Sequence, residues 1–263
     1  MVMFVITHKD FNFDLPKGYH KMLVGATQNT KVVSNKDDYL LDNTADNISI
    51  KNSSYCELTG IYWLWKNCDI KNIGISHYRR YFYDSKAGLI GKVKKYEELI
   101  QKNKLQPTSV KRLDELLQQY DWIVPPAVKI VDANVATEYI YAHYISDYYA
   151  MREAIRKLYP AYMDAFYNVM HQDRYYHFNM FYTSKKNFTD YCKWLFNILT
   201  EVENNIDITN YDPYQKRVFG FLAERLENVW LNYHNFKLYE MQIFETKDMD
   251  RNKIINKIKN KIK

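Results

Sequence analysis

The chain has 263 residues, which suffice for one sizeable α/β domain or at most two small ones. Only seven glycines and six prolines argue against a repetitive or disordered chain, while the 25 tyrosines suit a sugar-binding cleft as well as any half-buried surface. The net charge of +6 would fit a nucleic-acid-binding protein, but residues 247–263 carry seven basic and two acidic residues. The rest of the chain is nearly balanced, which disfavours a nucleic-acid partner.

The first elements predict the beginning of a nucleotide-binding half-sheet. Residues 3–7 read as a buried strand that ends in Thr7, His8 and Lys9, and residues 21–26 read as a second strand. No glycine-rich phosphate motif follows, which disfavours dinucleotide and P-loop proteins. Residues 27–54 are polar and predict a long functional loop.

The most informative stretch is Ile73-Gly74-Ile75-Ser76-His77-Tyr78-Arg79-Arg80-Tyr81-Phe82, which follows a predicted helix at 57–65. Its apolar start predicts a strand in the middle of a sheet, with the polar end at the carboxyl edge where open α/β sheets bind ligands. Arg79 and Arg80 suit phosphate, because the planar guanidinium binds anionic oxygens in a bidentate way, and His77 adds a further donor. Alternatively, one arginine pairs with a carboxylate and alternate side chains face solvent.

The remaining pattern predicts helices and three more strands in one domain. The helices are expected at 94–103, 109–119, 138–159, 188–202 and 212–233, and further strands at 121–125, 176–183 and 236–244. In the helix 138–159, His143 and Asp147 are four residues apart and would be neighbours on one face.

Residues 248–263 form a basic tail in which isoleucines recur at helical spacing. Such a helix could lie on an anionic membrane surface, and the alternative is a solvated terminus or the docking helix of a partner. The amino terminus lacks the layout of a secretion signal, and Cys56, Cys68 and Cys192 have no metal or redox spacing. We therefore expect a cytoplasmic protein with reduced thiols, peripheral on the inner face of the cell membrane if the tail binds there.

The string from Gly74 to Phe82 resembles the signature of a bacterial family of capsular and exopolysaccharide glycosyltransferases, long catalogued as a domain of unknown function. The resemblance covers about residues 3 to 240. Further matching strings are Ile6-Thr7-His8-Lys9, Asp46-Asn47-Ile48-Ser49, Glu57-Leu58-Thr59-Gly60-Ile61-Tyr62-Trp63, Asn179-Met180-Phe181 and Gly220-Phe221-Leu222-Ala223-Glu224-Arg225-Leu226. In this order, the strings are specific together, whereas each alone would be weak.

The resemblance implies a single GT-A-like domain at residues 1–247, with a mostly parallel central sheet flanked by helices. It implies transfer of a sugar, galactofuranose in some members, from a UDP-sugar donor to a growing, lipid-linked capsular or exopolysaccharide acceptor. A non-catalytic sugar-binding or nucleic-acid-binding module is the alternative function.

GT-A enzymes usually hold a divalent metal with Asp-x-Asp at a strand end. Here the central strand ends in His77-Tyr78-Arg79-Arg80, and the one Asp-x-Asp string is Asp248-Met249-Asp250 in the tail. We therefore expect cationic side chains to replace the metal. Mg²⁺ or Mn²⁺ bound by residues distant in sequence is the alternative.

An inverting transfer needs a general base, for which Glu224 and Asp147 are the candidates, the latter oriented by His143. Either carboxylate could instead belong to a structural ion pair. Thr7, His8 and Asp46 are expected to line the nucleotide pocket together with the stretch from His77 to Arg80. On the acceptor side, the candidates are His177, Asn179 and Arg225, although His177 also fits a half-buried structural histidine.

Overall fold

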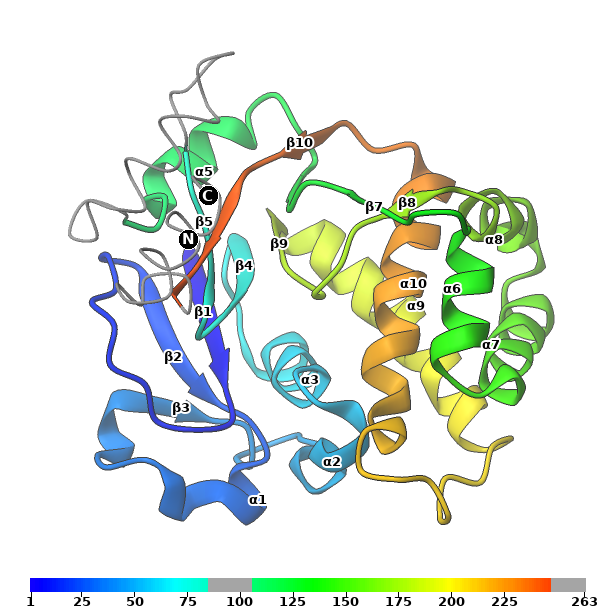
Figure 1. Ribbon diagram of the computed structural model, residues 1–263. Coiled ribbons are helices and arrows are strands. Elements are labelled where there is room, and N and C mark those ends of the chain that lie inside the picture. Colours follow the sequence, from blue (N-terminus) through cyan, green and yellow to red (C-terminus); the bar gives the residue numbers. More distant parts are fainter. Residues whose placement is uncertain (85–105, 247–263) are drawn as a thin grey trace, which may run out of the picture.

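The structure is a computed structural model that describes residues 1–84 and 106–246 (Figure 1). The strands are β1 (Val2–Thr7), β2 (Tyr19–Leu23), β3 (Tyr39–Leu41), β4 (Asn72–His77), β5 (Arg80–Phe82), β6 (Trp122–Val124), β7 (Val128–Lys129), β8 (Arg174–Tyr175), β9 (Phe181–Ser184), β10 (Leu238–Glu240) and β11 (Ile243–Glu245). The α-helices are α1 (Ala26–Asn29), α2 (Asn52–Tyr55), α3 (Leu58–Asn67), α5 (Val110–Leu116), α6 (Val135–Ala142), α7 (Ile145–Leu158), α8 (Met163–Met170), α9 (Lys185–Glu203) and α10 (Val218–His234). Short 3-10 helices are η1 (Thr30–Val32), η2 (Lys36–Asp38), η3 (Ser49–Lys51), η5 (Pro160–Tyr162) and η6 (Gln215–Arg217).

The central sheet has the strand order β10-β6-β9-β4-β1-β2-β3, with β5 and β11 attached beside β4. β1 runs parallel to both β2 and β4, and β3 continues this parallel half. β9 runs antiparallel between β4 and β6, and β5 is antiparallel to β4. The sheet is therefore largely parallel with some antiparallel pairing, and helices flank it, as the sequence predicts.

Both faces of the sheet are buried, which explains the continuous apolar runs of its central strands. In β1, Phe4 and Ile6 pack into the core beneath the helical half of the molecule, whereas Met3 and Val5 pack into a second core with β5, β11 and α5. Figure 1 shows α3, α9 and α10 on the first side and α5 on the other. The predicted helices at 57–65 and 188–202 are present as α3 and α9.

The prediction of one long loop at 27–54 is wrong, because this segment contains β3, the 3-10 helices η1, η2 and η3, and most of α1 and α2. Gly25 has a φ of +64°, which places its N–H and that of Ala26 within 2.9 Å of the buried carboxylate of Asp42. The hydroxyls of Ser49 and Thr59 donate to the same carboxylate at 2.6 Å. The hydrogen bonds to the Asp42 carboxylate thus hold this polar segment in an ordered conformation beside the ends of β1 and β2.

The single helix predicted at 138–159 is broken into α6 and α7, because His143 is extended, with φ of −139° and ψ of 177°. The amide of Gln215 stabilises the break: its oxygen accepts a hydrogen bond from Nδ1 of His143 at 2.9 Å and its nitrogen donates to the Ala142 carbonyl at 2.8 Å. The helix predicted at 212–233 accordingly begins as η6 and becomes α-helical only at Val218.

Two predicted strands differ as well. The strand predicted at 176–183 begins only at Phe181, because Phe178 and Asn179 have left-handed backbone conformations with φ of 84° and 46°. The segment 236–244 supplies β10 beside β6 and part of β11 beside β5, rather than one strand. The predicted helix 94–103 and the tail 248–263 lie outside the described residues.

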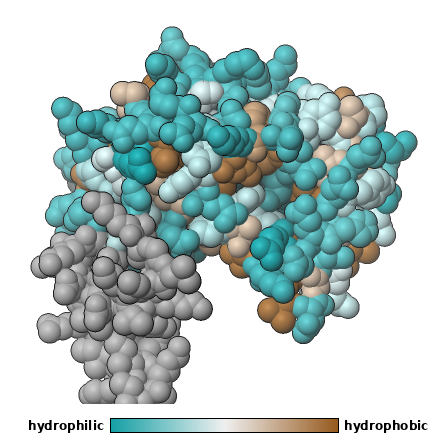
Figure 2. All heavy atoms as spheres, turned by 90° about the horizontal axis from the view of Figure 1, so that it is seen from above, coloured by the Kyte–Doolittle hydropathy of each residue, from teal (hydrophilic) through white to brown (hydrophobic). Residues whose placement is uncertain are grey.

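Seen from above, the described surface is mostly hydrophilic, with hydrophobic residues in small separate patches (Figure 2). Within residues 1–84 and 106–246, the helices are too short or too polar to cross a bilayer.

Candidate active site

A cavity of about 580 Å³ opens at the carboxyl ends of β1 and β4 and extends to α10. Its polar lining comes from Thr7 at the end of β1 and His8 after it, from His77, Tyr78, Arg79 and Arg80 around the β4–β5 turn, from Asn52, Ser53, Cys56 and Glu57 of the α2–α3 segment, and from Arg217 and Glu224 near the start of α10. Seven of the residues predicted from the sequence meet here. The parallel strands explain this convergence, since their carboxyl ends share one edge of the sheet.

Cationic groups collect on one side of the cavity. Partial burial lowers the pKa of His8, and the nearby charges of Lys9, Arg79 and Arg217 lower it further. The guanidinium of Arg79 lies 4.8 Å from the centre of the Tyr78 ring, and Nε of Arg217 contacts Sγ of Cys56 at 3.3 Å. Within the described residues, neither guanidinium forms an ion pair with a carboxylate, so both remain available to an anionic ligand.

Arg80 differs from its neighbour. Its Nε is 2.5 Å from Oε1 of Glu245 in β11, and its guanidinium lies 4.2 Å from the centre of the Phe178 ring. The alternative in which one arginine of the pair is neutralised by a carboxylate therefore applies to Arg80. This side chain helps to attach β11 and the Phe178 loop to the strand edge while still contributing to the lining of the cavity.

Phe178, a loop residue with a φ of 84°, connects the end of β4 with α10. Nε2 of His77 lies 2.6 Å from the carbonyl oxygen of Phe178, and because a carbonyl only accepts, Nε2 carries the proton. The N–H of Phe178 donates to Oε1 of Glu224 at 2.9 Å. Burial lowers the pKa of His77, and the charge of Glu57 opposes this effect. Strained backbone at such a position is typical of functional sites.

Glu224 is the carboxylate of the cavity best suited to accept a proton. Burial is the main cause that raises its pKa to about 7, and the neighbouring charge of Glu57 adds to the rise. Two neighbours limit this rise in pKa. They are the positive charge of Arg225, whose Nη1 lies 3.2 Å from Oε2 of Glu224, and the hydrogen bond from the N–H of Phe178. A pKa close to neutral pH is what a general base requires, because the group is then both ionised and basic.

Glu57 and Arg217 are site residues that the sequence reasoning missed. The amide of Asn179 donates to Oε1 of Glu57 at 2.7 Å and to the Gly220 carbonyl at 3.3 Å, which fixes Glu57 beside α10. Glu57 opens one of the family-like strings, so its position in that string could have marked it. Arg217 carried no comparable signal, because only the tertiary fold brings the start of α10 to the strand edge.

His143 and Asp147 lie outside the lining of this cavity and do not contact each other through hydrogen bonds. Asp147 is buried and accepts a hydrogen bond from the Tyr211 hydroxyl at 2.7 Å, while burial raises its pKa. The ring of His143 stacks on Phe221 with 4.2 Å between centroids. The break between α6 and α7 separates the pair that an unbroken helix would have placed on one face.

The other predicted residues have structural contacts. Asp46 is hydrogen-bonded to Tyr62 and Asn67 of α3 and does not line the cavity. The Thr7 hydroxyl lines it but donates to the Lys9 carbonyl at 2.5 Å.

The predicted acceptor residues lie behind the cavity wall. His177 stacks on Tyr175 at 3.8 Å, and burial is the main cause that lowers its pKa to about 4. Asn179 is fully buried. Arg225 is 2% exposed and forms ion pairs with Glu138 and Glu224, so it orients Glu224 from inside the protein.

The residues around this cavity do not fit a divalent metal. Its two carboxylates, Glu57 and Glu224, are each engaged by hydrogen bonds, and their neighbours are guanidiniums. Among residues 1–84 and 106–246, His, Cys, Asp and Glu do not gather in groups of three suited to a metal ion. Asp248-Met249-Asp250 lies outside these residues.

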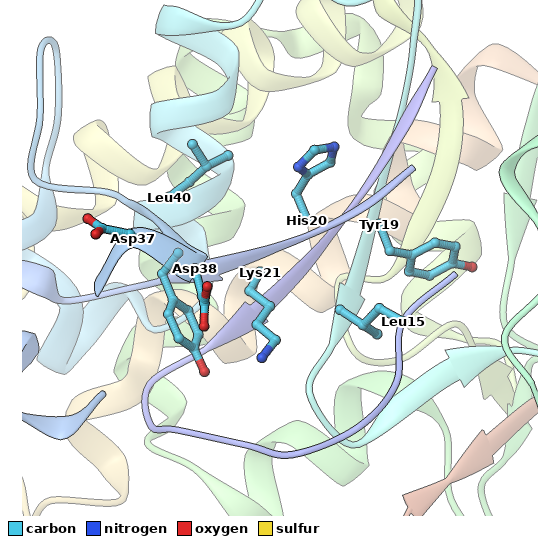
Figure 3. A pocket seen from close by; sticks show the side chains of 8 residues that line it. Leu15, Tyr19, His20, Lys21, Asp37, Asp38 and Leu40 are labelled. Carbon is cyan, nitrogen blue, oxygen red and sulfur yellow. The ribbon is translucent and has the colours of Figure 1, made fainter. Parts of the chain in front are cut away.

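A second hollow, of about 430 Å³, lies over β2 and β3 (Figure 3). It is lined by Leu15, Tyr19, His20, Lys21, Asp37, Asp38, Tyr39 and Leu40, among which are none of the residues predicted to form a site. The ammonium group of Lys21 lies 5.0 Å and 5.2 Å from the centres of the Phe11 and Tyr39 rings, which already hold it.

The fold and the cavity define an α/β protein whose candidate site lies at the carboxyl edge of a largely parallel sheet. The chain belongs to the family described as domain of unknown function DUF4422, which matches residues 2–235. A solved structure described as the apo form of the WbbM bifunctional glycosyltransferase is similar, with a TM-score of 0.79 at 29% sequence identity. The similarity covers 93% of this chain but 45% of that one, so the chain spans less than half of its length. Curated proteins gave no match.

Proposed function

We propose that the chain is a glycosyltransferase of the GT-A type that moves a sugar from a UDP-sugar donor to a saccharide acceptor with inversion. The observation that carries the proposal is the charged lining of the cavity: it combines the guanidiniums of Arg79 and Arg217, which no described carboxylate pairs, with the carboxylate of Glu224, whose pKa is about 7. The similarity to a bifunctional glycosyltransferase over 93% of this chain supports the same class of reaction.

In the proposed reaction, the carboxylate of Glu224 takes the proton of an acceptor hydroxyl. The acceptor oxygen then forms a bond to the anomeric carbon of the donor sugar, from the face opposite the diphosphate. The bond between this carbon and the diphosphate oxygen breaks, and UDP leaves with the electron pair. Arg79, Arg217 and His8 stabilise the charge that develops on the diphosphate.

No step in this scheme uses a metal, because the described cavity residues do not fit one. Transfer should therefore persist in excess EDTA. Complete loss of activity with EDTA, restored by Mg²⁺ or Mn²⁺, would show that ligands outside the described residues complete a metal site.

We further propose galactofuranose as the first donor sugar to test and a lipid-linked capsular or exopolysaccharide chain as the acceptor. Both follow from the family resemblance. The proposed setting is the cytoplasmic face of the cell membrane, reached through the basic tail at 248–263. Binding to anionic vesicles that falls with salt and disappears on truncation after Lys247 would support this setting, whereas equal binding by the truncated chain would contradict it.

The experiment that tests the proposed function compares UDP, UDP-galactofuranose, UDP-galactopyranose, ADP and GDP as stabilisers of the folded chain. A nucleotide at 100 times its Kd should stabilise the protein by about 2.7 kcal/mol. The stabilising UDP-sugar should then be consumed in the presence of saccharide acceptors. Stabilisation without turnover would favour a non-catalytic sugar-binding protein, and no response to any nucleotide would reject the proposal.

A further inference from the structure

A group of aromatic rings lies beside the cavity, on the segment that leads into α10, on the first turn of α10 and on the turn between α6 and α7. Tyr214 is 53% exposed, and its ring centroid lies 5.1 Å from that of Phe221. Phe221 stacks in turn on His143, and the rings of Tyr211 in the first of these segments and Tyr144 in the last lie 4.3 Å apart. We call these five residues the aromatic ledge.

The ledge is continuous with the cavity through Arg217. The guanidinium of Arg217 lies 5.3 Å from the centre of the Phe221 ring and 6.0 Å from that of Tyr214. Arg217 and Pro213 also line the cavity. A molecule lying on Tyr214 would therefore lie next to the mouth of the cavity that contains Glu224.

The ledge is held in place by the protein itself. The carboxylate of Asp212 accepts hydrogen bonds from the N–H groups of Tyr214 and Gln215 at 2.8 and 3.1 Å. The Gln215 amide oxygen accepts from Nδ1 of His143 at 2.9 Å, which ties the two segments together. A preformed surface loses little conformational entropy when a ligand binds.

We infer that the aromatic ledge binds the acceptor saccharide and places its reacting hydroxyl toward Glu224; this inference rests on the proposed function. A pyranose ring offers a C–H face, which packs on aromatic rings, and a rim of hydroxyls, which requires polar neighbours. Both are present, because the exposed residue Tyr214 lies on the same segment as Asp212, Gln215 and Arg217, and the exposed residue Tyr144 packs against Tyr211 of that segment. His143 contributes a hydrogen-bond acceptor, since Nδ1 donates to Gln215 and leaves Nε2 of the neutral ring with a lone pair.

A hydrocarbon chain fits the ledge less well. Covering it with lipid would remove water from Asp212 and Arg217 without supplying hydrogen bonds, which is costly for charged groups. A saccharide satisfies the same groups with its hydroxyls. The composition of the surface therefore favours a sugar over the lipid part of a lipid-linked acceptor.

The test is saturation-transfer NMR with the methyl glycosides of galactose, glucose, mannose and rhamnose, and with octyl glucoside, on the full chain saturated with UDP. Tyr214→Ala is compared with Tyr167→Ala, a control tyrosine on α8 that is 44% exposed and does not line the cavity. Saturation should reach the ring C–H protons of at least one glycoside. Loss of one aromatic contact in Tyr214→Ala should weaken binding about two- to tenfold, whereas Tyr167→Ala should match the wild type.

Several results would overturn the inference. These are equal signals from wild type and Tyr214→Ala, no signal from any glycoside in a protein that binds UDP, or saturation confined to the octyl chain of octyl glucoside. Calorimetry with UDP distinguishes a failure of the aromatic-ledge inference from a failure of the proposed glycosyltransferase function. A chain that does not bind UDP contradicts the nucleotide site, while a Tyr214-dependent glycoside signal in that chain would still support a sugar-binding ledge.

Discussion

The two sides of the cavity are built in different ways. On the cationic side, Arg79 of the β4–β5 turn and Arg217 of η6 carry charges that no described carboxylate neutralises, and His8 lies among them. On the α10 side, Glu57 and Glu224 are each held by hydrogen bonds from Asn179 and the Phe178 backbone. The first side is suited to bind a negatively charged ligand, and the second holds the carboxylate of Glu224 at a raised pKa. Substitutions on the two sides should therefore have different kinetic effects.

The largest effect is expected for Glu224→Gln, which keeps the size of the side chain but cannot accept a proton. The kcat should fall by about 10² or more with UDP affinity unchanged. In the wild type, kcat/KM should rise with pH up to about 7, the pKa of Glu224. Asp147→Asn is the matched control, because this buried carboxylate also has a raised pKa but lies outside the cavity lining. Steady-state kinetics with equal losses in both variants would contradict the assignment of the base.

The arginine pair gives the next largest effect, and here the binding of UDP changes rather than turnover alone. Arg79→Ala removes an unpaired guanidinium, so UDP should lose a charged contact of about 1.5–3 kcal/mol. Arg80→Ala should weaken UDP binding less, because that guanidinium is already engaged by Glu245 and Phe178. Titration calorimetry checks the ranking, and a greater loss in Arg80→Ala than in Arg79→Ala would reverse our view of the two residues.

Stability should show a smaller, pH-dependent effect on the α10 side. The pKa of Glu224 is raised from 4.5 to about 7 in the folded chain, so the folded state holds this proton more tightly than the unfolded state. This contribution to stability is complete below the unfolded pKa and is lost as pH rises toward about 7. The variant Glu224→Gln has no carboxyl group to ionise, so its free energy of unfolding does not fall in this way. Relative to wild type, it should gain on the order of 3 kcal/mol between pH 5 and pH 8, since each pKa unit is about 1.4 kcal/mol.

Urea denaturation of both proteins at the two pH values measures this difference. Parallel pH dependences for wild type and Glu224→Gln would mean that Glu224 has an ordinary pKa in the folded chain.

The smallest effect is expected at His8. Its pKa is lowered by partial burial and by Lys9, Arg79 and Arg217, and an anion among these cations would offset their charge. The pKa of His8 should therefore rise when UDP binds, whereas uridine, which lacks the diphosphate, should leave it unchanged. NMR titration of the imidazole C–H signals provides the measurement. A fall or no change with UDP would place the diphosphate away from this side of the cavity.

The sequence predicted one side of the cavity much better than the other. The strand edge is contiguous in sequence, so a buried strand that ends in His77 and is followed by Arg79 could be read from apolar runs and residue types. The α10 side combines Glu57, Phe178 and Glu224 from three distant segments, and no local pattern reports such contacts. The break at His143 was invisible for the same reason, since it depends on Gln215, 72 positions later.

The left-handed conformation of Phe178 has a consequence for the distance between the two walls of the cavity. The N–H of this residue contacts α10 through Glu224 and its carbonyl contacts β4 through His77, so one backbone unit acts as a spacer between the two walls. Glycine would adopt the same φ with less strain, but it would give up the aromatic cover over Arg80. The distance between the two walls therefore depends on the backbone of a single uncharged residue.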